Sequence, residues 1–322
     1  MDSVEHPEAL ALPYHYKAFG LNIASDRQIG ALTPCDIDSI DVTIEHLAQD
    51  RSLPQETYAV EFANWRAAPQ KFRIDVTGIA SYLVTDGDRI LVRAESGTPE
   101  NVIDSFLIGS AFAALLQQRR FLTLHASGVL TNAGAVLFIG RSGAGKSTTL
   151  AALHERGFDM VTDDVAAIRT AENNRPLITP SFPGGRVTAQ TLERLGLSSD
   201  DRQVLGGDVV KYSHEMHFTS VREAEVARIF VLDIWDQPEI SIEPVSATDA
   251  FETLSAFTFR KRFYDGMDMQ AFHFEAMLKL AGAAKVYRVR RPDEPFMLDE
   301  LVEALVAEIG EPARKIATNV AG

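Results

Sequence analysis

This chain contains the run Gly140-Arg141-Ser142-Gly143-Ala144-Gly145-Lys146-Ser147, in which a Gly and four further residues precede Gly-Lys-Ser. Because glycines lack a Cβ, they let successive backbone N–H groups turn inward around a chain of phosphates. The ammonium group of Lys146 can reach β- and γ-phosphates, and the hydroxyl of Ser147 can bind Mg²⁺. The run therefore predicts a phosphate-binding loop, or P-loop; the alternative is a glycine-rich turn that binds nothing.

The residues on either side of this loop supply the context that the motif requires. Residues 135–139 are apolar and predict a buried strand, and residues 147–156 favour a helix. Such a helix would begin at the loop and direct the positive end of its dipole at bound phosphates. We therefore expect residues 140–147 and Thr148 to bind the phosphates of a nucleotide.

Composition narrows the class of protein. A length of 322 residues suggests two domains, or one large domain with an appendage. The formal net charge of −14 argues against nucleic acid as the main partner, because a phosphate backbone needs a basic surface.

No segment has the apolar length of a membrane span, and residues 1–6 lack the pattern of a signal peptide, so we expect a cytoplasmic protein. The only cysteine, Cys35, excludes an internal disulfide, and we expect its side chain to be buried.

The first third of the chain predicts a small sheet-rich domain. Its strand-like segments are 21–24, 42–44, 72–76, 80–84 and 89–92. Between the last two, Asp86-Gly87 predicts a hairpin turn, because this dipeptide tolerates the positive φ of tight turns. A break at residues 95–98 precedes a long helical pattern that extends to residue 119. We place the domain boundary there, which gives a sheet-rich domain at 1–98 and a nucleotide-binding domain at 99–322.

The remaining two thirds predict a mixture of strands and helices. Residues 122–130 and 135–139 would form a hairpin that leads directly into the P-loop. This antiparallel entry differs from simple P-loop NTPases, whose parallel strands are joined by helical crossovers. Further strands are expected at 158–162, 165–168, 229–234, 240–242 and 285–290. Helices are expected at 188–195, 247–256, 270–281 and 298–308.

Two adjacent carboxylates follow the strand that is predicted after the P-loop helix. Asp163 and Asp164 come at the carboxyl end of that strand, where doubly wound sheets bind ligands. Phosphoryl transfer needs the phosphates held, Mg²⁺ placed and the acceptor hydroxyl deprotonated. Since neighbouring side chains of a strand point in opposite directions, one carboxylate can bind Mg²⁺ while the other faces the acceptor as a base. The alternative is that one of them only caps a turn.

The motifs around this pair resemble the catalytic core of HPr serine kinase/phosphorylase. Leu-His-Ala-Ser at 124–127, a hairpin, the P-loop, a short helix, Arg-Gly and a strand ending in Asp-Asp follow in the same order and spacing. The match covers residues 125–168. That family consists of bacterial protein kinases whose fold is similar to phosphoenolpyruvate carboxykinase. The resemblance implies an α/β fold with α+β elements, in which a P-loop core of this type accompanies a small sheet-rich N-terminal domain. It also implies ATP and Mg²⁺ as cofactors.

The resemblance assigns roles to individual residues. It implies that His125 helps to position the transferred phosphate, although the spacing of His125 alone leaves a structural role open. It implies that Asp163 is the general base for the acceptor serine. It places Asp164 on the side of the metal, where the P-loop motif already places Ser147.

Departures from the family indicate a particular branch of it. We find no counterpart of the family's Glu-Ile-Arg-Gly-Leu-Gly run or of its later Pro-Val-Arg-Pro-Gly-Arg loop. In that region we expect Arg186 and Lys211 to be the cations that meet ATP phosphates or substrate. A further basic cluster at 260–262 is expected to be a solvated surface run; the alternative is a role at the edge of the site that binds the substrate or the nucleotide base. The chain is thus similar to the HPr-kinase-related group, which includes lasso-peptide precursor kinases, some of which phosphorylate a serine of a precursor peptide.

The sequence therefore predicts an ATP- and Mg²⁺-dependent kinase that phosphorylates a serine hydroxyl of a peptide or small protein. Two alternatives remain: the same fold acting on a small metabolite, and a nucleotide-binding regulator without transfer. The pair of aspartates argues against the regulator, because binding alone does not require a base. We expect a peptide or small-protein partner, no nucleic acid and no membrane span, and the resemblance implies a homo-oligomer.

Overall fold

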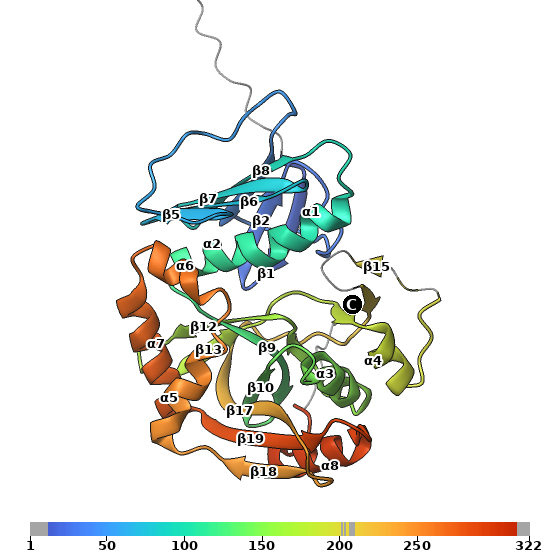
Figure 1. The fold of residues 1–322 in the computed structure, drawn as a ribbon. Coiled ribbons are helices and arrows are strands. Elements are labelled where there is room, and N and C mark those ends of the chain that lie inside the picture. Colours follow the sequence, from blue (N-terminus) through green and yellow to red (C-terminus); the bar gives the residue numbers. More distant parts are fainter. Residues whose placement is uncertain (1–11, 201, 203, 206–209, 314–322) are drawn as a thin grey trace, which may run out of the picture.

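The computed structural model describes residues 12–200, 202, 204–205 and 210–313, which form a mixed α/β structure. Figure 1 shows one sheet at the top, drawn in blue and cyan, and a second sheet in the lower part of the molecule. A helical segment drawn in teal lies between the first sheet and the rest of the chain (Figure 1). The mixed α/β class agrees with the expectation from the sequence.

Within the described residues, the first sheet has eight strands in the order β1-β2-β3-β8-β7-β6-β5-β4. They are β1 (Tyr14–Ala18), β2 (Leu21–Ser25), β3 (Val42–His46), β4 (Val60–Glu61), β5 (Trp65–Ala68), β6 (Lys71–Val76), β7 (Ala80–Thr85) and β8 (Arg89–Ala94). β3 is parallel to both β2 and β8, and the other neighbours are antiparallel. The predicted hairpin between β7 and β8 is confirmed, and its turn has φ of 54° at Asp86 and 70° at Gly87. Positive φ at both positions is what a two-residue turn of this kind requires.

The long helical pattern predicted after residue 98 is also confirmed. It consists of α1 (Glu100–Phe106), a π-helical turn η1 (Leu107–Ala111) and α2 (Phe112–Gln118). Leu107 and Phe112 are buried in one core with Tyr82 of the first sheet. The hydroxyl of Tyr82 donates a hydrogen bond to the carbonyl of Ile103 at 2.7 Å. The segment therefore packs on the first sheet as part of its core.

The second sheet is built around the predicted hairpin. Its strands are β9 (Leu122–Thr131), β10 (Gly134–Gly140), β11 (Met160–Thr162), β12 (Val165–Thr170), β13 (Pro176–Thr179), β17 (Ala224–Trp235), β18 (Ser241–Pro244) and β19 (Lys285–Pro292). β10 is antiparallel to β9 on one side and parallel to β17 on the other. Because the order β10-β9-β12-β13-β17 returns to β10, these strands form a closed cycle, which β19 and β18 extend from β17. The sheet is therefore mixed, as the antiparallel entry into the loop indicates.

Helices cover both faces of this second sheet. The helices that follow β10 are α3 (Lys146–Glu155), α4 (Ala189–Arg194), α5 (Ala247–Ser255), α6 (Lys261–Gly266), α7 (Gln270–Ala283) and α8 (Leu298–Ile309), and of these α6 packs in the core of the first sheet. Val136 and Phe138 of β10 share a buried cluster with α3 and α8, whereas Leu137 and Ile139 share one with α5 and α7. This alternation follows the two-residue period of a strand and fixes the position of α3 at the end of β10. Of these helices, only the short α6 was not predicted.

A small sheet of order β14-β16-β15 lies beside α3. Its strands are β14 (Gly185–Val187), β15 (Val204–Leu205) and β16 (Lys211–His214). Val187 is buried in the cluster that contains the apolar residues of α3. No sequence pattern predicted these short strands.

Two further expectations concern the burial of Cys35 and membrane-spanning helices. Cys35 is exposed, so the expectation of a buried side chain was wrong. The residue lies in the loop between β2 and β3, where its N–H donates to the carbonyl of His15 at 3.0 Å and its side chain stays at the surface. In the part of the chain that the structure describes, no helix has the length and apolar character needed to cross a membrane.

Candidate functional site

The glycine-rich loop joins β10 to α3, as the sequence predicts. Gly140 lies opposite Leu232 of β17, and a Cβ at Gly140 would stand only 2.5 Å from the carbonyl oxygen of Leu232. Gly143 and Gly145 have φ of 84° and 105°, in the left-handed region that favours glycine. Gly145 is the N-cap of α3. Close approach and positive φ therefore explain the glycines of the loop.

The side chains of the loop lie in different environments. Arg141 and Ser142 are exposed, as is Gly143. The side chain of Lys146 is buried, and its Nζ donates to the carbonyls of Gly140 at 2.9 Å and Arg141 at 3.3 Å. The ammonium group thus lies across the loop, at the place where the P-loop motif requires a cation.

Two other residues of the predicted loop are turned toward the protein interior. Ala144 is buried in the cluster between α3 and α8. The hydroxyl of Thr148 is hydrogen bonded to that of Thr191 on α4 at 2.8 Å. Of the predicted nucleotide contacts, Thr148 therefore directs its side chain at α4 and not at the loop.

Asp163 and Asp164 interrupt the ladder that β11 and β12 make with β9. Thr162 pairs with Gly128 and Val165 with His125, while the two aspartates between them leave the ladder. Asp164 has φ of 79°, which is uncommon for a residue other than glycine but is best tolerated by Asp and Asn. Irregularities of this kind re-aim side chains next to active sites. Here the interruption gives the two carboxylates different partners.

Asp163 is the inner of the two carboxylates, with 8% of its surface exposed. Its Oδ1 accepts hydrogen bonds from Ser127 Oγ at 2.8 Å and from Ser147 Oγ at 3.1 Å. Asp163 therefore connects β9 to the first turn of α3. The carboxylate and hydroxyl oxygens of Asp163 and Ser147 are ligands of the kind that Mg²⁺ prefers.

The oxygens of Asp163 and Ser147 are too few to hold Mg²⁺ by themselves. They fit the ion only if the phosphates of a bound nucleotide are also its ligands. In the described part of the chain, no group of three or more His, Cys, Asp or Glu side chains could hold a metal. Mg²⁺ is commonly bound by one or two protein oxygens together with substrate phosphates and water. The pair formed by Ser147 and Asp163 suits that mode of binding.

Asp164 is the outer carboxylate, and its side chain is 27% exposed. His125 Nδ1 lies 3.2 Å from Asp164 Oδ1 and 3.0 Å from the backbone oxygen of the same residue. The ring of Phe259 lies 5.8 Å from that of His125, and the guanidinium of Arg260 lies 5.4 Å from the Phe259 ring centre. The basic run at 260–262 therefore begins beside the predicted site.

The two remaining predicted cations lie on the small sheet beside α3. Arg186 pairs with Ser213 in β14 and β16, and Lys211 pairs with Leu205 in β16 and β15. The side chains of Arg186 and Lys211 lie outside what the structure describes. Their roles stay predictions.

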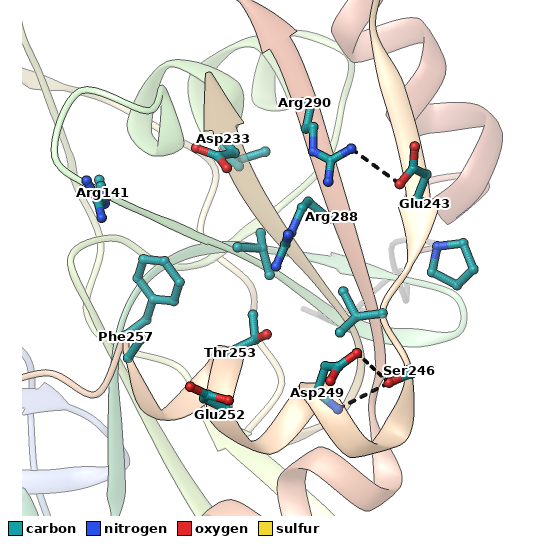
Figure 2. A pocket seen from close by; sticks show the side chains of 15 residues that line it. Arg141, Asp233, Glu243, Ser246, Asp249, Glu252, Thr253, Phe257, Arg288 and Arg290 are labelled. Carbon is teal, nitrogen blue, oxygen red and sulfur yellow. Dashed lines mark hydrogen bonds and ion pairs between the residues drawn. The ribbon is translucent and has the colours of Figure 1, made fainter. Parts of the chain in front are cut away.

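A cleft of about 600 Å³ begins at the loop and extends away from it. Figure 2 shows Arg141 and Phe257 toward one end of this cleft and the ion pair of Glu243 with Arg290 toward the other. The N–H of His125 donates to the carbonyl of Phe257 at 3.0 Å, so the near end adjoins the pair of His125 and Asp164. Most of the lining is polar, and its charged residues are Arg141, Asp233, Glu243, Asp249, Glu252, Arg288 and Arg290.

Two residues of this region, Ser127 and Arg291, have no role predicted from the sequence. Ser127 belongs to the Leu-His-Ala-Ser motif, and its spacing of two residues from His125 places both on one face of β9, a signal that could have identified it. Arg291, at the end of β19, donates to the carbonyl of Ala144 at 3.1 Å. Its 147 positions of separation from Ala144 leave no local pattern that could have identified it.

Comparisons with known proteins find similarity to solved structures alone. No protein-family model matches it, and no curated protein matches it. Among solved structures, the HPr(Ser) kinase/phosphatase from Coxiella burnetii is similar at 17% sequence identity and a TM-score of 0.27. The similarity covers 58% of this chain and 94% of that one.

Proposed function

We propose that the chain is an ATP- and Mg²⁺-dependent phosphotransferase that phosphorylates a serine hydroxyl of a peptide or small protein. One observation supports this most strongly: two neighbouring carboxylates contact two different groups. Asp163 accepts a hydrogen bond from Ser147 of the loop, and Asp164 contacts His125. A loop that only bound nucleotide would need the first contact but not the second.

The inner half of the site would hold the nucleotide. The loop N–H groups and Lys146 would bind the phosphates, and Ser147 with Asp163 would hold Mg²⁺. When bound, Mg²⁺ neutralises part of the charge on the β- and γ-phosphates. Ser127 would orient Asp163 through its hydrogen bond of 2.8 Å.

The outer half of the site would act on the acceptor. A general base must reach the acceptor hydroxyl, and the side chain of Asp164 is 27% exposed whereas Asp163 is 8% exposed. We therefore assign Asp164 as the base and Asp163 to the metal, which exchanges the roles that the family resemblance implies. His125 would hold the Asp164 carboxylate in place.

The proposed step is a single displacement. The acceptor oxygen forms a bond to the γ-phosphorus while its proton passes to the carboxylate of Asp164. The bond from the γ-phosphorus to the β–γ bridging oxygen breaks, and ADP leaves with that oxygen. Lys146, close to the loop carbonyls, would stabilise the charge on the transferred group.

The acceptor would enter through the cleft that begins at Arg141 and Phe257. Its mostly polar lining suits a hydrophilic peptide segment better than an apolar one. A volume of about 600 Å³ is also within the range of small-molecule sites, which favours a polar metabolite as the second candidate acceptor. A panel of serine peptides and hydroxyl-containing metabolites, incubated with labelled ATP and analysed by mass spectrometry, separates the two.

Two matched variants test the assignment of roles with any acceptor found in this way. Asp164→Asn should reduce phosphate transfer by about 10²–10⁴-fold, because the base is lost, while the Kd for Mg-ATP stays unchanged. Asp163→Asn should raise the Mg²⁺ concentration needed for half-maximal transfer by about tenfold or more. Full transfer by Asp164→Asn, or an unchanged magnesium requirement in Asp163→Asn, would overturn the assignment.

A further inference from the structure

A buried arginine lies directly against the glycine-rich loop. Arg291, near the end of β19, is only 2% exposed. Its Nη2 donates to the carbonyl of Ala144 at 3.1 Å, and its Nη1 donates to the carbonyl of Pro292 at 2.7 Å. A Cβ built on Gly145 would lie 3.6 Å from the same Nη2. The guanidinium therefore packs against the segment where the loop turns into α3.

The charge of Arg291 is poorly compensated. It forms no ion pair with any residue that the structure describes, and its buried Nε has no hydrogen-bond partner among those residues. Its guanidinium stacks on the ring of Phe296 at 4.1 Å, and Arg194 lies over the same ring at 3.9 Å. Two cations thus flank one aromatic ring beside the loop.

The surrounding charges act on Arg291 in opposite directions. Burial is the largest influence and lowers the pKa of its guanidinium; Asp293 raises that pKa and Arg194 lowers it. Asp293 is exposed, and the Glu294 carboxylate that lies 3.8 Å from Arg194 is 77% exposed, so solvent screens both acids. An arginine stays protonated in proteins, so the site retains a buried positive charge.

Such a charge is costly unless an anion binds nearby. Burial of an ion without a partner is destabilising, and replacing it by an apolar side chain of similar volume is often neutral or stabilising. The nearest functional element is the loop, where Lys146 and the N-terminus of the ten-residue helix α3 add further positive potential. Positive potential from several sources at one place suits a polyphosphate.

We propose that Arg291 is a positioning residue that fixes the Ala144 carbonyl and supplies a buried positive charge to the loop for binding the polyphosphate of the nucleotide. This inference rests on the proposed function of the loop. Arg291 acts through the backbone and through its field, since its side chain is enclosed by protein. The ligand class is therefore a polyphosphate anion, whether free or part of a nucleotide.

A purely structural role for Arg291 makes the opposite prediction for the protein without ligand. If the two hydrogen bonds and the contact with Phe296 serve only to hold β19 to the loop, their removal should lower the melting temperature. If the charge is uncompensated, its removal should leave the melting temperature unchanged or raise it. The two roles therefore predict different changes in the melting temperature of the protein without ligand.

The test measures the melting temperature without ligand and the Kd for inorganic tripolyphosphate and for Mg-ATP, using the full chain. Arg291→Met should melt at the same temperature as the wild type or higher, and bind both ligands about tenfold or more weakly. Arg291→Lys retains the charge and should recover most of the affinity. The control Arg228→Met removes a half-buried arginine of β17 whose Nε also has no partner among the described residues, and it should bind as the wild type does.

The binding and melting results separate failure of the proposed function from failure of the inference about Arg291. A wild-type protein that binds neither ligand contradicts both the proposed function and this inference. Binding by the wild type together with a change of less than about twofold in Arg291→Met overturns the inference alone. A melting temperature lowered by several degrees in Arg291→Met, or failure of that variant to fold, shows a structural role and overturns it as well.

Discussion

At the scale of single residues, the direction of two adjacent side chains determines the chemistry that the site can perform. The positive φ of Asp164 turns its carboxylate toward His125, while Asp163 remains inside and accepts from two serine hydroxyls. Hydrogen bonds to a charged carboxylate are stronger than neutral ones. The inner carboxylate is therefore held more firmly than the outer one, as a metal ligand and a base would respectively require.

Ser127 provides a test of how firmly Asp163 is held. Its hydroxyl is buried and donates to a carboxylate, so Ser127→Ala should lower the free energy of unfolding by about 2 kcal/mol. Ser255 is also buried, but its hydroxyl has no partner among the described residues, so Ser255→Ala should leave stability unchanged or raised. Urea denaturation of both variants measures the difference. Equal losses in the free energy of unfolding for the two variants would show that the contact of Ser127 with Asp163 contributes nothing to stability.

The sequence predicted which residues lie together at the candidate site better than it predicted the contacts that each one makes. The loop and the two aspartates depend on residue type and local spacing, which a sequence displays directly. The contacts of Asp163 and Asp164 depend on one backbone angle and on pairing with β9, neither of which a local pattern contains. The contact of Arg291 with Ala144 depends on the parallel chain of contacts from β10 through β17 to β19, which only the folded structure brings together.

At the scale of elements, close packing against β17 constrains the exit of β10 into α3. Gly140 is paired with Leu232 of the neighbouring strand, and the loop must leave the sheet at that point. Gly143, in contrast, is exposed, and a Cβ there would meet nothing within 4 Å. The two glycines are therefore needed for different reasons.

A pair of alanine substitutions separates these reasons. Gly140→Ala would place its Cβ 2.5 Å from the carbonyl of Leu232, so the strands must move apart and the free energy of unfolding should fall by about 3 kcal/mol. Gly143→Ala meets no neighbour, and its positive φ should cost only about 1 kcal/mol. Chemical denaturation gives both values. A smaller loss for Gly140→Ala than for Gly143→Ala would contradict the close approach of β10 and β17.

Elements with a clear period or a turn signal were predicted, and short ones without either were not. The hairpins, the long helical segment and helices α3, α4, α5, α7 and α8 all have such signals. The elements that were not predicted are β1, β4, β5, β13, β14, β15, β16 and α6, each of six residues or fewer, and their positions depend on contacts with other parts of the chain. The interruption between β11 and β12 agrees with the two strands predicted there.

At the scale of the whole molecule, the first sheet supports the candidate site through a shared core. The ring of Phe263 on α6 lies 4.2 Å from that of Phe72 and 5.3 Å from that of Trp65, both on the first sheet. The hydroxyl of Tyr264 donates to the carbonyl of Phe121 at 2.7 Å, and burial raises the pKa of this hydroxyl so that it remains a donor. The segment that carries Phe259 beside His125 is therefore anchored on the first sheet.

The oligomeric state, the domain boundary and the partners are also properties of the whole molecule. The homo-oligomer, the domain boundary after residue 98 and the identity of the acceptor stay predictions. They depend on surfaces and loops that have no local sequence code. The proposed function depends on one premise, which is that the loop binds the phosphates of ATP.

Isothermal titration calorimetry of the full chain with Mg-ATP tests that premise most directly. We predict saturable binding at one site with a Kd between about 1 μM and 1 mM. Lys146→Ala should weaken it by at least about tenfold, because the loop loses its ammonium group. Lys279→Ala, which removes a surface lysine paired with Glu275, should bind as the wild type does. Absence of binding by the wild type, or equal binding by Lys146→Ala, would contradict the account.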